Sequence, residues 1–324
     1  MILTIASYGA ALRKFGSCIE VEGRDEKQRV PADEVTSILL TSPCSLSSEL
    51  ISLCMERDIS VTMLDHCGTP QWRAERFHGG ITPLIRRSQM QLSATREGVL
   101  LAKALIRQKN DKRVAYLRRL ASNRRNETGA ELKRTCHRIK GVMSSLDRLE
   151  SETVDTIRKK LMGYEGMAGS LYFRSLSSIL PKDADFQKRE RGNEAGPFNQ
   201  MLNYGYGILY REIFSLCAQS GLDPYVGLLH TETYDRPVLV YDLVEPFRVV
   251  VEETVVKLFT LRKARREKIL EQIPGGIMLS LEGKKLLISA LEERMDGLDA
   301  PRKEMRGLVF DLARQMKSWK GLRA

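Results

Sequence analysis

One histidine and two carboxylates in this 324-residue chain have the types and spacing needed to bind a divalent metal ion. His230 is the only histidine in the second half of the sequence, and Asp242 and Glu245 follow it by 12 and 15 residues. Residues three apart lie on one face of a helix, so these carboxylates are expected to point the same way. A histidine and two carboxylates directed at one point can hold Mn²⁺ or Mg²⁺, and the imidazole favours Mn²⁺.

The Asp242-x-x-Glu245 pair also has a structural interpretation. It matches a helix start in which the aspartate caps the backbone and the glutamate reaches back to the cap. Pro237 and Pro246 lie nearby and mark unusual backbone, as expected at a helix boundary. A single histidine such as His230 can equally be a packed or surface residue. Spacing alone therefore leaves both interpretations open.

Two further features could contribute to such a site. Glu165 lies among glycines and apolar residues, where a buried carboxylate needs a partner, although an exposed glutamate in the first turn of a helix is the alternative. A glycine-containing loop with Lys188, Arg189 and Arg191 could clamp phosphate, or could be a solvated surface loop. The chain contains no GxxxxGK[ST], GxGxxG, GxSxG or HExxH motif, so nucleotide-driven, dinucleotide-dependent and serine-hydrolase chemistry has no support in the sequence.

The positive charge of the chain is concentrated in one segment. Of the net charge of +11, residues 81–160 account for +12, because they carry 20 Lys and Arg but 8 Asp and Glu. Residues 1–80 carry a net charge of −3. Such a segment indicates a surface for a polyanion such as nucleic acid, or else a set of solvated helix faces.

The hydrophobic periodicity predicts an α+β fold, with a small N-terminal β-rich domain followed by a larger all-α domain. In residues 1–80, apolar and polar residues alternate in short segments, which predicts strands around one helix, SLSSELISLCMERD. In residues 81–324, the apolar residues recur with helical periodicity. The six cysteines form no CxxC pair, and no apolar run is long enough to cross a membrane, which predicts a cytoplasmic protein with reduced cysteines.

The sequence also predicts where the individual helices of residues 81–324 begin and end. The sequence predicts separate helices at about 89–109 and 112–121, and a helix interrupted at Met162-Gly163. It predicts a helix over 199–220 that Gly221 ends, and one long helix from Tyr241 to about Gln272. The last two helices are expected at about 281–296 and 300–319, with no repeats anywhere in the chain.

Four ordered motifs resemble the family of CRISPR-associated adaptation integrases: EGMAGSLYF, NQMLNYGYGILY, GLDPYVGLLH and YDLVEPFR. Members of that family are metal-dependent endonuclease-integrases that insert new spacers into CRISPR arrays. The resemblance covers the whole chain. It implies that residues 1–80 form a dimerisation domain and that residues 81–324 form the catalytic and DNA-binding domain.

The resemblance also implies roles for individual residues. The implied metal ligands, which are also catalytic, are Glu165, His230 and Glu245. Asp242 is implied to be an accompanying catalytic acid that can still cap a helix and so hold Glu245. Val249 departs from the family, where many relatives have proline, and the loop from Glu190 to Pro197 differs from the commoner arginine–proline pattern. Together with the basic segment, the resemblance predicts these DNA-binding residues: Arg118, Arg119, Lys188, Arg189, Arg191, Asn199 and Arg248.

The implied reaction is transesterification with Mn²⁺ or Mg²⁺, in which the 3′-OH of a spacer precursor attacks a phosphodiester at the end of a CRISPR repeat. The expected partners are double-stranded DNA, a second copy of the chain in a homodimer, and a small ferredoxin-like CRISPR adaptation protein. No membrane partner is expected. Two alternatives stay open: a non-catalytic DNA-binding subunit of the same fold, and a nuclease that repairs branched DNA.

Overall fold

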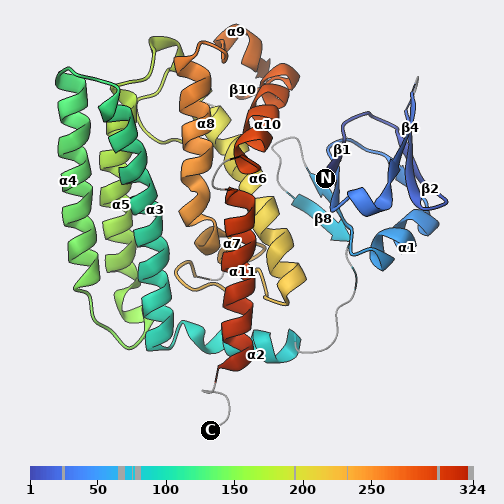
Figure 1. Ribbon diagram of the computed structural model, residues 1–324, viewed down its shortest axis with the longest axis horizontal. Helices are drawn as coiled ribbons and strands as arrows, with labels where there is room; N and C mark the ends of the chain where they lie inside the picture. The colour runs from blue at the N-terminus through green and yellow to red at the C-terminus, as the bar shows by residue number, and fades with distance from the viewer. Residues whose placement is uncertain are drawn as a thin grey trace. The chain divides into compact units, whose positions relative to one another are not determined.

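The computed structural model describes residues 1–23, 26–64, 70–74, 76, 82–192, 195–231, 233–297 and 300–319. The chain divides into two compact units, Met1–Gly80 and Ile81–Ala324 (Figure 1). The first unit is rich in strands and the second is mostly helical, which confirms the α+β class. In the described part of the chain, no helix has the length and apolar character needed to span a membrane. Dimerisation by the first unit and catalysis by the second stay predictions.

Of the two sheets that the described residues of the first unit form, one is largely parallel. Its strands, in spatial order, are β1 (Ile2–Ile5), β5 (Ser37–Leu40), β7 (Ser60–Leu64) and β8 (Pro70–Ala74). β1, β5 and β7 pair in parallel, so the chain must cross over between them, and α1 (Ser48–Glu56) is the crossover between β5 and β7. Ser47 caps α1 by accepting a hydrogen bond from the Leu50 N–H at 3.2 Å.

The other sheet is built on a tight hairpin. Its order is β4 (Lys27–Pro31), β3 (Cys18–Glu22), β2 (Ala11–Phe15) and β6 (Ser45–Leu46), and η1 (Ala32–Glu34) follows β4. Phe15 lies opposite Cys18, and the turn between them places Gly16 at φ 60°, a left-handed conformation that glycine adopts without steric cost. Side chains from both sheets and α1 form one core, including Leu12, Ile38 and Leu50. The sequence CGTP at residues 67–70 predicts a turn before β8, and most of these residues lie outside those that the structure describes.

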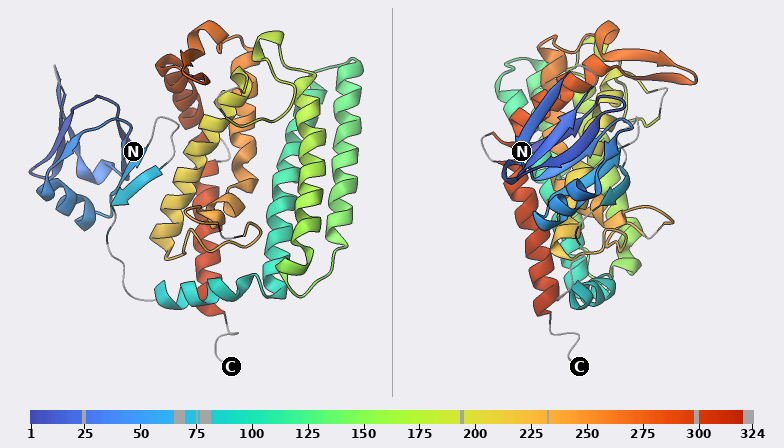
Figure 2. Two further views of the ribbon diagram at one scale, coloured as in Figure 1. Left: turned by 180° about the vertical axis from the view of Figure 1, so that it is seen from behind. Right: turned by 90° about the vertical axis from the view of Figure 1, so that its right-hand side faces the viewer.

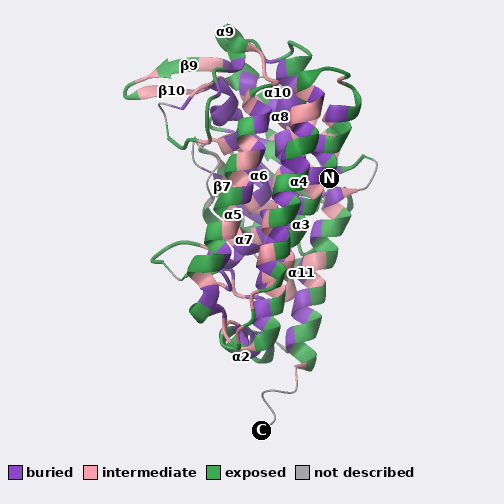
Figure 3. Cartoon of the chain, turned by 90° about the vertical axis from the view of Figure 1, so that its left-hand side faces the viewer, coloured by how far each residue is buried: buried purple, intermediate pink, exposed green. Residues whose placement is uncertain are grey.

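The second unit is a layered helical assembly. Its main helices are α2 (Thr82–Leu92), α3 (Arg96–Ser122), α4 (Glu127–Asp147), α5 (Val154–Ser177), α6 (Pro197–Ser220), α8 (Arg248–Thr260), α10 (Leu281–Met295) and α11 (Pro301–Ser318). Shorter elements are η2 (Lys182–Ala184), α7 (Val238–Leu243), η3 (Glu245–Phe247) and α9 (Arg266–Ile269). α3, α4 and α5 run side by side, and α3 also packs against α8 (Figures 1 and 2). Their buried sides face one another, and their exposed sides face outward (Figure 3).

The second unit is mostly helical, as predicted, but its described residues also include a β-hairpin that the sequence does not predict. β9 (Leu270–Ile273) and β10 (Gly276–Leu279) form an antiparallel hairpin, which projects from one end of the unit (Figure 2). Gly275 and Gly276 have φ values of 87° and 143°, so this turn uses conformations that only glycine adopts easily. The helix that the sequence predicts as far as about Gln272 overlaps the first of these strands.

Two predicted helix breaks are also wrong. α3 is continuous through Asn110, whose buried side-chain amide donates to Ile106 O at 2.8 Å and so supports the helix instead of ending it. The chain breaks earlier, where Thr95 caps α3. α5 continues through Gly163, because one glycine costs only about 1 kcal/mol in a helix and buried residues on both sides hold it in place.

After Tyr241 the sequence predicts one continuous helix where the structure has several short ones. The predicted long helix is divided into α7, η3, α8 and α9. Pro246 lacks the N–H that would continue the helical ladder, so the backbone changes to the 3₁₀ geometry of η3. Arg262, with φ 54°, lies just beyond the end of α8. The predicted helices at 199–220, 281–296 and 300–319 correspond to α6, α10 and α11, and Gly221 ends α6 at φ 84° as expected.

A buried ion pair joins three of these helices. Arg113 of α3 donates from Nε to Glu252 Oε2 of α8 at 3.1 Å, and its Nη2 also contacts that carboxylate. The Tyr206 hydroxyl of α6 donates to Glu252 Oε1 at 2.9 Å. Burial alone would raise the pKa of Glu252, but Arg113 and Tyr206 hold that pKa below its ordinary value. The pair therefore stays charged inside the core.

We expect Glu252→Gln to lower the free energy of unfolding by about 3–5 kcal/mol, because it leaves the buried Arg113 guanidinium without its counter-charge. A carboxylate with a lowered pKa stabilises the fold above its unfolded pKa, and this contribution is lost as the pH falls towards the folded pKa. Urea unfolding at pH 7 and pH 4 should therefore show a smaller difference between variant and wild type at pH 4. An equal difference at both pH values would contradict this assignment.

Candidate active site

Two of the predicted ligands meet at a lysine that the sequence did not single out. Glu165 on α5 accepts a hydrogen bond from the Lys109 ammonium of α3 at 2.5 Å, and the same ammonium forms an ion pair with Glu245 Oε2 in η3. The side chains of Lys109 and Glu245 are 5% and 4% exposed, so these charges are buried. The structure therefore gathers Glu165 and Glu245 around one cation.

Glu245 is the most constrained of these carboxylates. Its Oε1 accepts a hydrogen bond from Arg248 Nε at 2.8 Å. Its Oε2 is buried and, apart from the ion pair with Lys109, has no hydrogen bond in the described structure. Burial would raise the pKa of Glu245, but Arg248 and Lys109 lower it to about 2. The group is therefore an anion at any physiological pH, with one oxygen held and the other directed at a cation.

Asp242 has a different role from the predicted helix cap. It lies inside α7, and its carboxylate faces back to the turn before His230 instead of capping a helix start. Oδ2 accepts from the backbone N–H groups of Leu228 at 2.7 Å and Leu229 at 3.0 Å. Oδ1 accepts from the His230 backbone at 3.1 Å and lies 2.6 Å from His230 Nδ1. With four donors around it, this carboxylate has no free side for a metal ion.

The contact with Asp242 fixes the tautomer of His230. An ionised carboxylate only accepts hydrogen bonds, so Nδ1 carries a proton, and in the neutral imidazole Nε2 keeps its lone pair. Such a carboxylate–histidine arrangement is typical of metal-binding histidines. Burial lowers the pKa of His230, but Asp242, Glu245 and Glu165 together raise it above its ordinary value. These three acids therefore act on His230 in one electrostatic environment.

The side chains as they lie do not form a closed set of metal ligands. Among the residues that the structure describes, no group of three or more His, Cys, Asp or Glu side chains is arranged to hold a metal ion. The Lys109 ammonium lies between Glu165 and Glu245 and pairs with both carboxylates. The donor set nevertheless fits a metal ion: two carboxylate oxygens and an imidazole nitrogen are ligands that Mn²⁺ accepts.

The predicted phosphate loop is anchored on α6. The Arg189 guanidinium donates to Asn199 Oδ1 at 3.1 Å and also contacts Asn203 Oδ1. Asn199 is buried, donates to Lys188 O at 2.9 Å and accepts from the Glu190 backbone at 3.2 Å. Asn199 therefore shapes the loop rather than facing solvent. Lys188 and Arg191 are exposed beside it.

Arg248 also has an internal role. Beyond its hydrogen bond to Glu245, its guanidinium lies 4.7 Å from the ring centroid of Tyr206 and 5.4 Å from that of Tyr210. Cation–π contacts of this kind are strongest where water is excluded. Arg248 therefore orients the Glu245 carboxylate. A direct contact of Arg248 with DNA stays a prediction.

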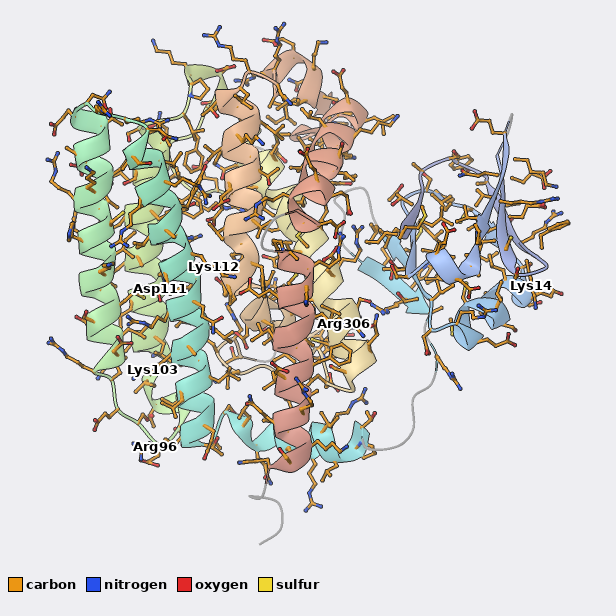
Figure 4. The ribbon with its side chains drawn as sticks, in the orientation of Figure 1. Lys14, Arg96, Lys103, Asp111, Lys112 and Arg306 are labelled. Carbon is orange, nitrogen blue, oxygen red and sulfur yellow. The ribbon has the colours of Figure 1, made fainter. Side chains whose placement is uncertain are left out.

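The basic segment divides between interior and surface. Lys103 and Lys112 both extend from α3 (Figure 4). Lys103 donates to Asp147 O and Leu149 O, both at 2.8 Å, and so caps the end of α4. Lys112 donates to Glu304 of α11 at 2.6 Å. Arg118 and Arg119 are exposed on α3, although Arg119 lies 2.6 Å from Glu253. Part of the +12 charge is therefore structural, and the remainder is available to a polyanion.

Lys109 could have been suspected from the helix pattern. It follows Leu105 and Ile106 on the buried stripe of α3, where an apolar residue is expected. A charged residue on an apolar stripe requires a buried counter-charge. The signal was present in the sequence, but the partners lie more than 50 residues away and no spacing rule identifies them.

Comparison with known proteins gives one consistent result. Residues 3–293 match the family model described as CRISPR associated protein Cas1. The CRISPR-associated endonuclease Cas1 1 of Archaeoglobus fulgidus is 32% identical over 308 residues, which cover 91% of this chain and 88% of that relative.

Solved structures show the same fold at lower identity. A casposase bound to integration product superimposes with a TM-score of 0.81 at 20% identity, over 99% of this chain and 91% of the casposase chain. A chain in the Cas6-RT-Cas1–Cas2 complex superimposes with a TM-score of 0.76 at 20% identity, over 98% of this chain and 35% of that longer chain.

We expect Lys109→Met to lower the free energy of unfolding by about 3–5 kcal/mol, because the buried Glu245 carboxylate and the partly buried Glu165 carboxylate lose their shared cation. Lys112→Met is the matched control on the same helix. Its partner Glu304 is half exposed, so its loss should cost less than about 1 kcal/mol. Chemical unfolding of both variants in metal-free buffer measures the difference, and equal losses would show that Lys109 does not balance the two acids.

Proposed function

This chain belongs to the Cas1 family of CRISPR-associated proteins, and from that premise we propose that its helical unit is a metal-dependent DNA endonuclease and integrase. The observation that carries this proposal is the convergence of Glu165 and Glu245 on one buried cation, together with a histidine whose Nδ1 is held by Asp242. The Archaeoglobus relative is named as an endonuclease, and the casposase was solved with its integration product. Both names support DNA strand chemistry for this chain.

The proposed cofactor is Mn²⁺ or Mg²⁺, held by Glu165, Glu245 and Nε2 of His230. When bound, such an ion polarises a phosphate oxygen and stabilises charge on the attacking or leaving oxygen. Asp242 keeps the proton of His230 on Nδ1, and Arg248 holds Oε1 of Glu245. Lys109 supplies a positive charge beside both carboxylates. These residues fix the ligands before any substrate arrives, which is the usual source of catalytic preorganisation.

The proposed reaction exchanges one phosphodiester bond for another. The 3′-oxygen of a spacer precursor forms a bond to phosphorus at the end of a CRISPR repeat. The bond from that phosphorus to the 3′-oxygen of the neighbouring nucleotide breaks, and the proton of the attacking hydroxyl ends on the released one. Because the number of phosphodiester bonds is unchanged, the protein needs no energy-rich cofactor. Hydrolysis is the same step with water as the nucleophile.

The proposed substrate is double-stranded DNA, bound through phosphates rather than bases. The exposed arginines of α3 and the loop residues Lys188 and Arg191 supply positive charge for it. A homodimer formed by the first unit, and a small ferredoxin-like CRISPR adaptation protein, complete the proposed assembly. The structural neighbour solved in a complex of Cas1 with Cas2 supports a partner of this kind.

Glu165→Ala, His230→Ala and Glu245→Ala should each lower joining of a labelled DNA 3′ end to a repeat by about 100-fold or more in Mn²⁺, since each removes a proposed ligand. Asp242→Asn should lower it about 10–100-fold, because it disturbs the tautomer behind a ligand. Glu304→Gln on α11 is the matched control and should stay fully active. Full activity of all the ligand variants would show that the metal assignment is wrong, whereas a wild-type protein that binds DNA but joins none in Mn²⁺ would favour a non-catalytic DNA-binding subunit. A preference for branched DNA over repeat DNA would favour a repair nuclease.

Arg118→Glu combined with Arg119→Glu should weaken DNA binding without unfolding the protein, because both side chains are exposed. Loss of two phosphate contacts should reduce the slope of log K against log salt by about 2. Arg314→Glu with Lys317→Glu makes the same charge change on α11 and serves as the control. Filter binding across a salt series measures both. Unchanged affinity for DNA at low salt would show that these two arginines are not part of the DNA-binding surface.

A further inference from the structure

The segment that delivers His230 has little regular structure of its own. Between the end of α6 at Ser220 and the start of α7 at Val238, the described backbone forms turns instead of helix or strand. Backbone polar groups in such a segment need partners from elsewhere, because an unpaired buried group costs free energy. The partners of residues 223–230 therefore decide where the imidazole lies.

Side chains from three helices supply those partners. Gln89 of α2 is 3% exposed, and its Nε2 donates to Asp223 O at 2.7 Å and Val226 O at 2.8 Å. Gln89 Oε1 accepts from the Asp223 N–H at 2.8 Å. Arg158 of α5 donates from Nε to Leu229 O at 2.8 Å.

The third side chain is Asp242, which accepts from the backbone N–H groups of Leu228, Leu229 and His230. Gln89 thus holds the beginning of the segment, whereas Arg158 and Asp242 hold its end. Both ends of the turn are fixed by hydrogen bonds to other elements, so its backbone has one well-defined path to His230.

The turn between these anchors has no spare room. A Cβ atom on Gly227 would lie 2.2 Å from His230 O and 2.9 Å from Val238 Cγ2. The backbone of His230 is therefore folded directly over Gly227, one residue after the part that Gln89 holds. A displacement of Asp223–Val226 must move Gly227, and with it the histidine.

We propose that Gln89 is a positioning residue for His230, acting through the backbone of the Asp223–Val226 turn, and that Arg158 assists at the other end. Asp242 orients the imidazole ring, whereas Gln89 places the backbone from which the ring extends. The consequence for metal binding rests on the proposed function. The mechanical part of the proposal, that Gln89 holds the turn, does not.

Gln89→Met tests this directly, because methionine has a similar length but cannot make the three hydrogen bonds. Hydrogen exchange followed by mass spectrometry should show faster exchange in the peptide covering residues 223–230, with little change in peptides from α10 and α11. The Mn²⁺ affinity, measured by calorimetry in the full chain, should fall about tenfold. If Gln89→Met folds poorly, Arg158→Met offers a second test, because it removes a partly exposed side chain. It should give the same two effects.

A double-mutant cycle separates positioning from general destabilisation. In the His230→Ala background, Gln89→Met should cause no further loss of Mn²⁺ affinity, because the residue that it positions is already absent. Arg302→Met is the control for stability, since Arg302 pairs with Glu212, Glu292 and Asp296 on other elements and should leave Mn²⁺ affinity unchanged.

The two proposals fail in different ways. Unchanged exchange over residues 223–230 in Gln89→Met would overturn the positioning role, whatever happens to metal binding. An equal loss of Mn²⁺ affinity with and without His230 would also overturn it. If His230→Ala itself leaves Mn²⁺ affinity unchanged, the proposed metal centre is wrong, and the exchange measurement still decides whether Gln89 holds the turn.

Discussion

The helical unit depends on a balance of charges that are buried at its centre. The Lys109 ammonium lies between Glu165 and Glu245, and Arg248 holds the second of these carboxylates from the other side. In an interior of low dielectric constant, each of these charges would be costly without the others. They come from α3, α5, η3 and α8, so the elements must meet in one arrangement for the balance to exist. The same contacts therefore specify both the packing of the helices and the geometry of the site.

A second buried ion pair lies next to these charges and helps to hold them in place. Arg113, one helical turn beyond Lys109 on α3, pairs with Glu252 of α8, and Tyr206 of α6 donates to the same carboxylate. Tyr206 also lies under the Arg248 guanidinium, so the two groups of charges share an aromatic ring. This arrangement requires α6 and α8 to approach closely, which is possible because residue 205 is glycine. A Cβ atom at that position would lie 2.4 Å from Val251 Cγ1. Small residues and buried charges thus act together to bring the helices near enough for the site to form.

The sequence predicted the periodic parts of this protein well and the non-local parts poorly. The strand-rich character of the first unit and the helices α6, α10 and α11 follow from periodicity and from local signals such as Gly221. Errors arose where a local signal was overruled by packing, as at Gly163, or where one residue changed the backbone, as at Pro246. Glu165, His230 and Glu245 were selected because of family resemblance, since spacing alone allowed Asp242-x-x-Glu245 to be a helix cap. Lys109 and Gln89 were missed because their partners lie far away in the chain and contribute nothing to local pattern.

The two acids of that short motif show why spacing cannot assign chemistry. Asp242 and Glu245 are three residues apart and both buried, yet their surroundings give them opposite tasks. Asp242 is surrounded by four N–H groups of the Leu228–His230 turn, so every oxygen position is occupied and the residue can only organise its neighbours. Glu245 has one oxygen held by Arg248 and one that meets only a cation. An acid becomes a candidate ligand when the fold leaves one of its oxygens without a neutral donor. Here the break at Pro246 separates the two acids, because it ends α7 after Asp242 and turns Glu245 towards Lys109 instead of the histidine turn.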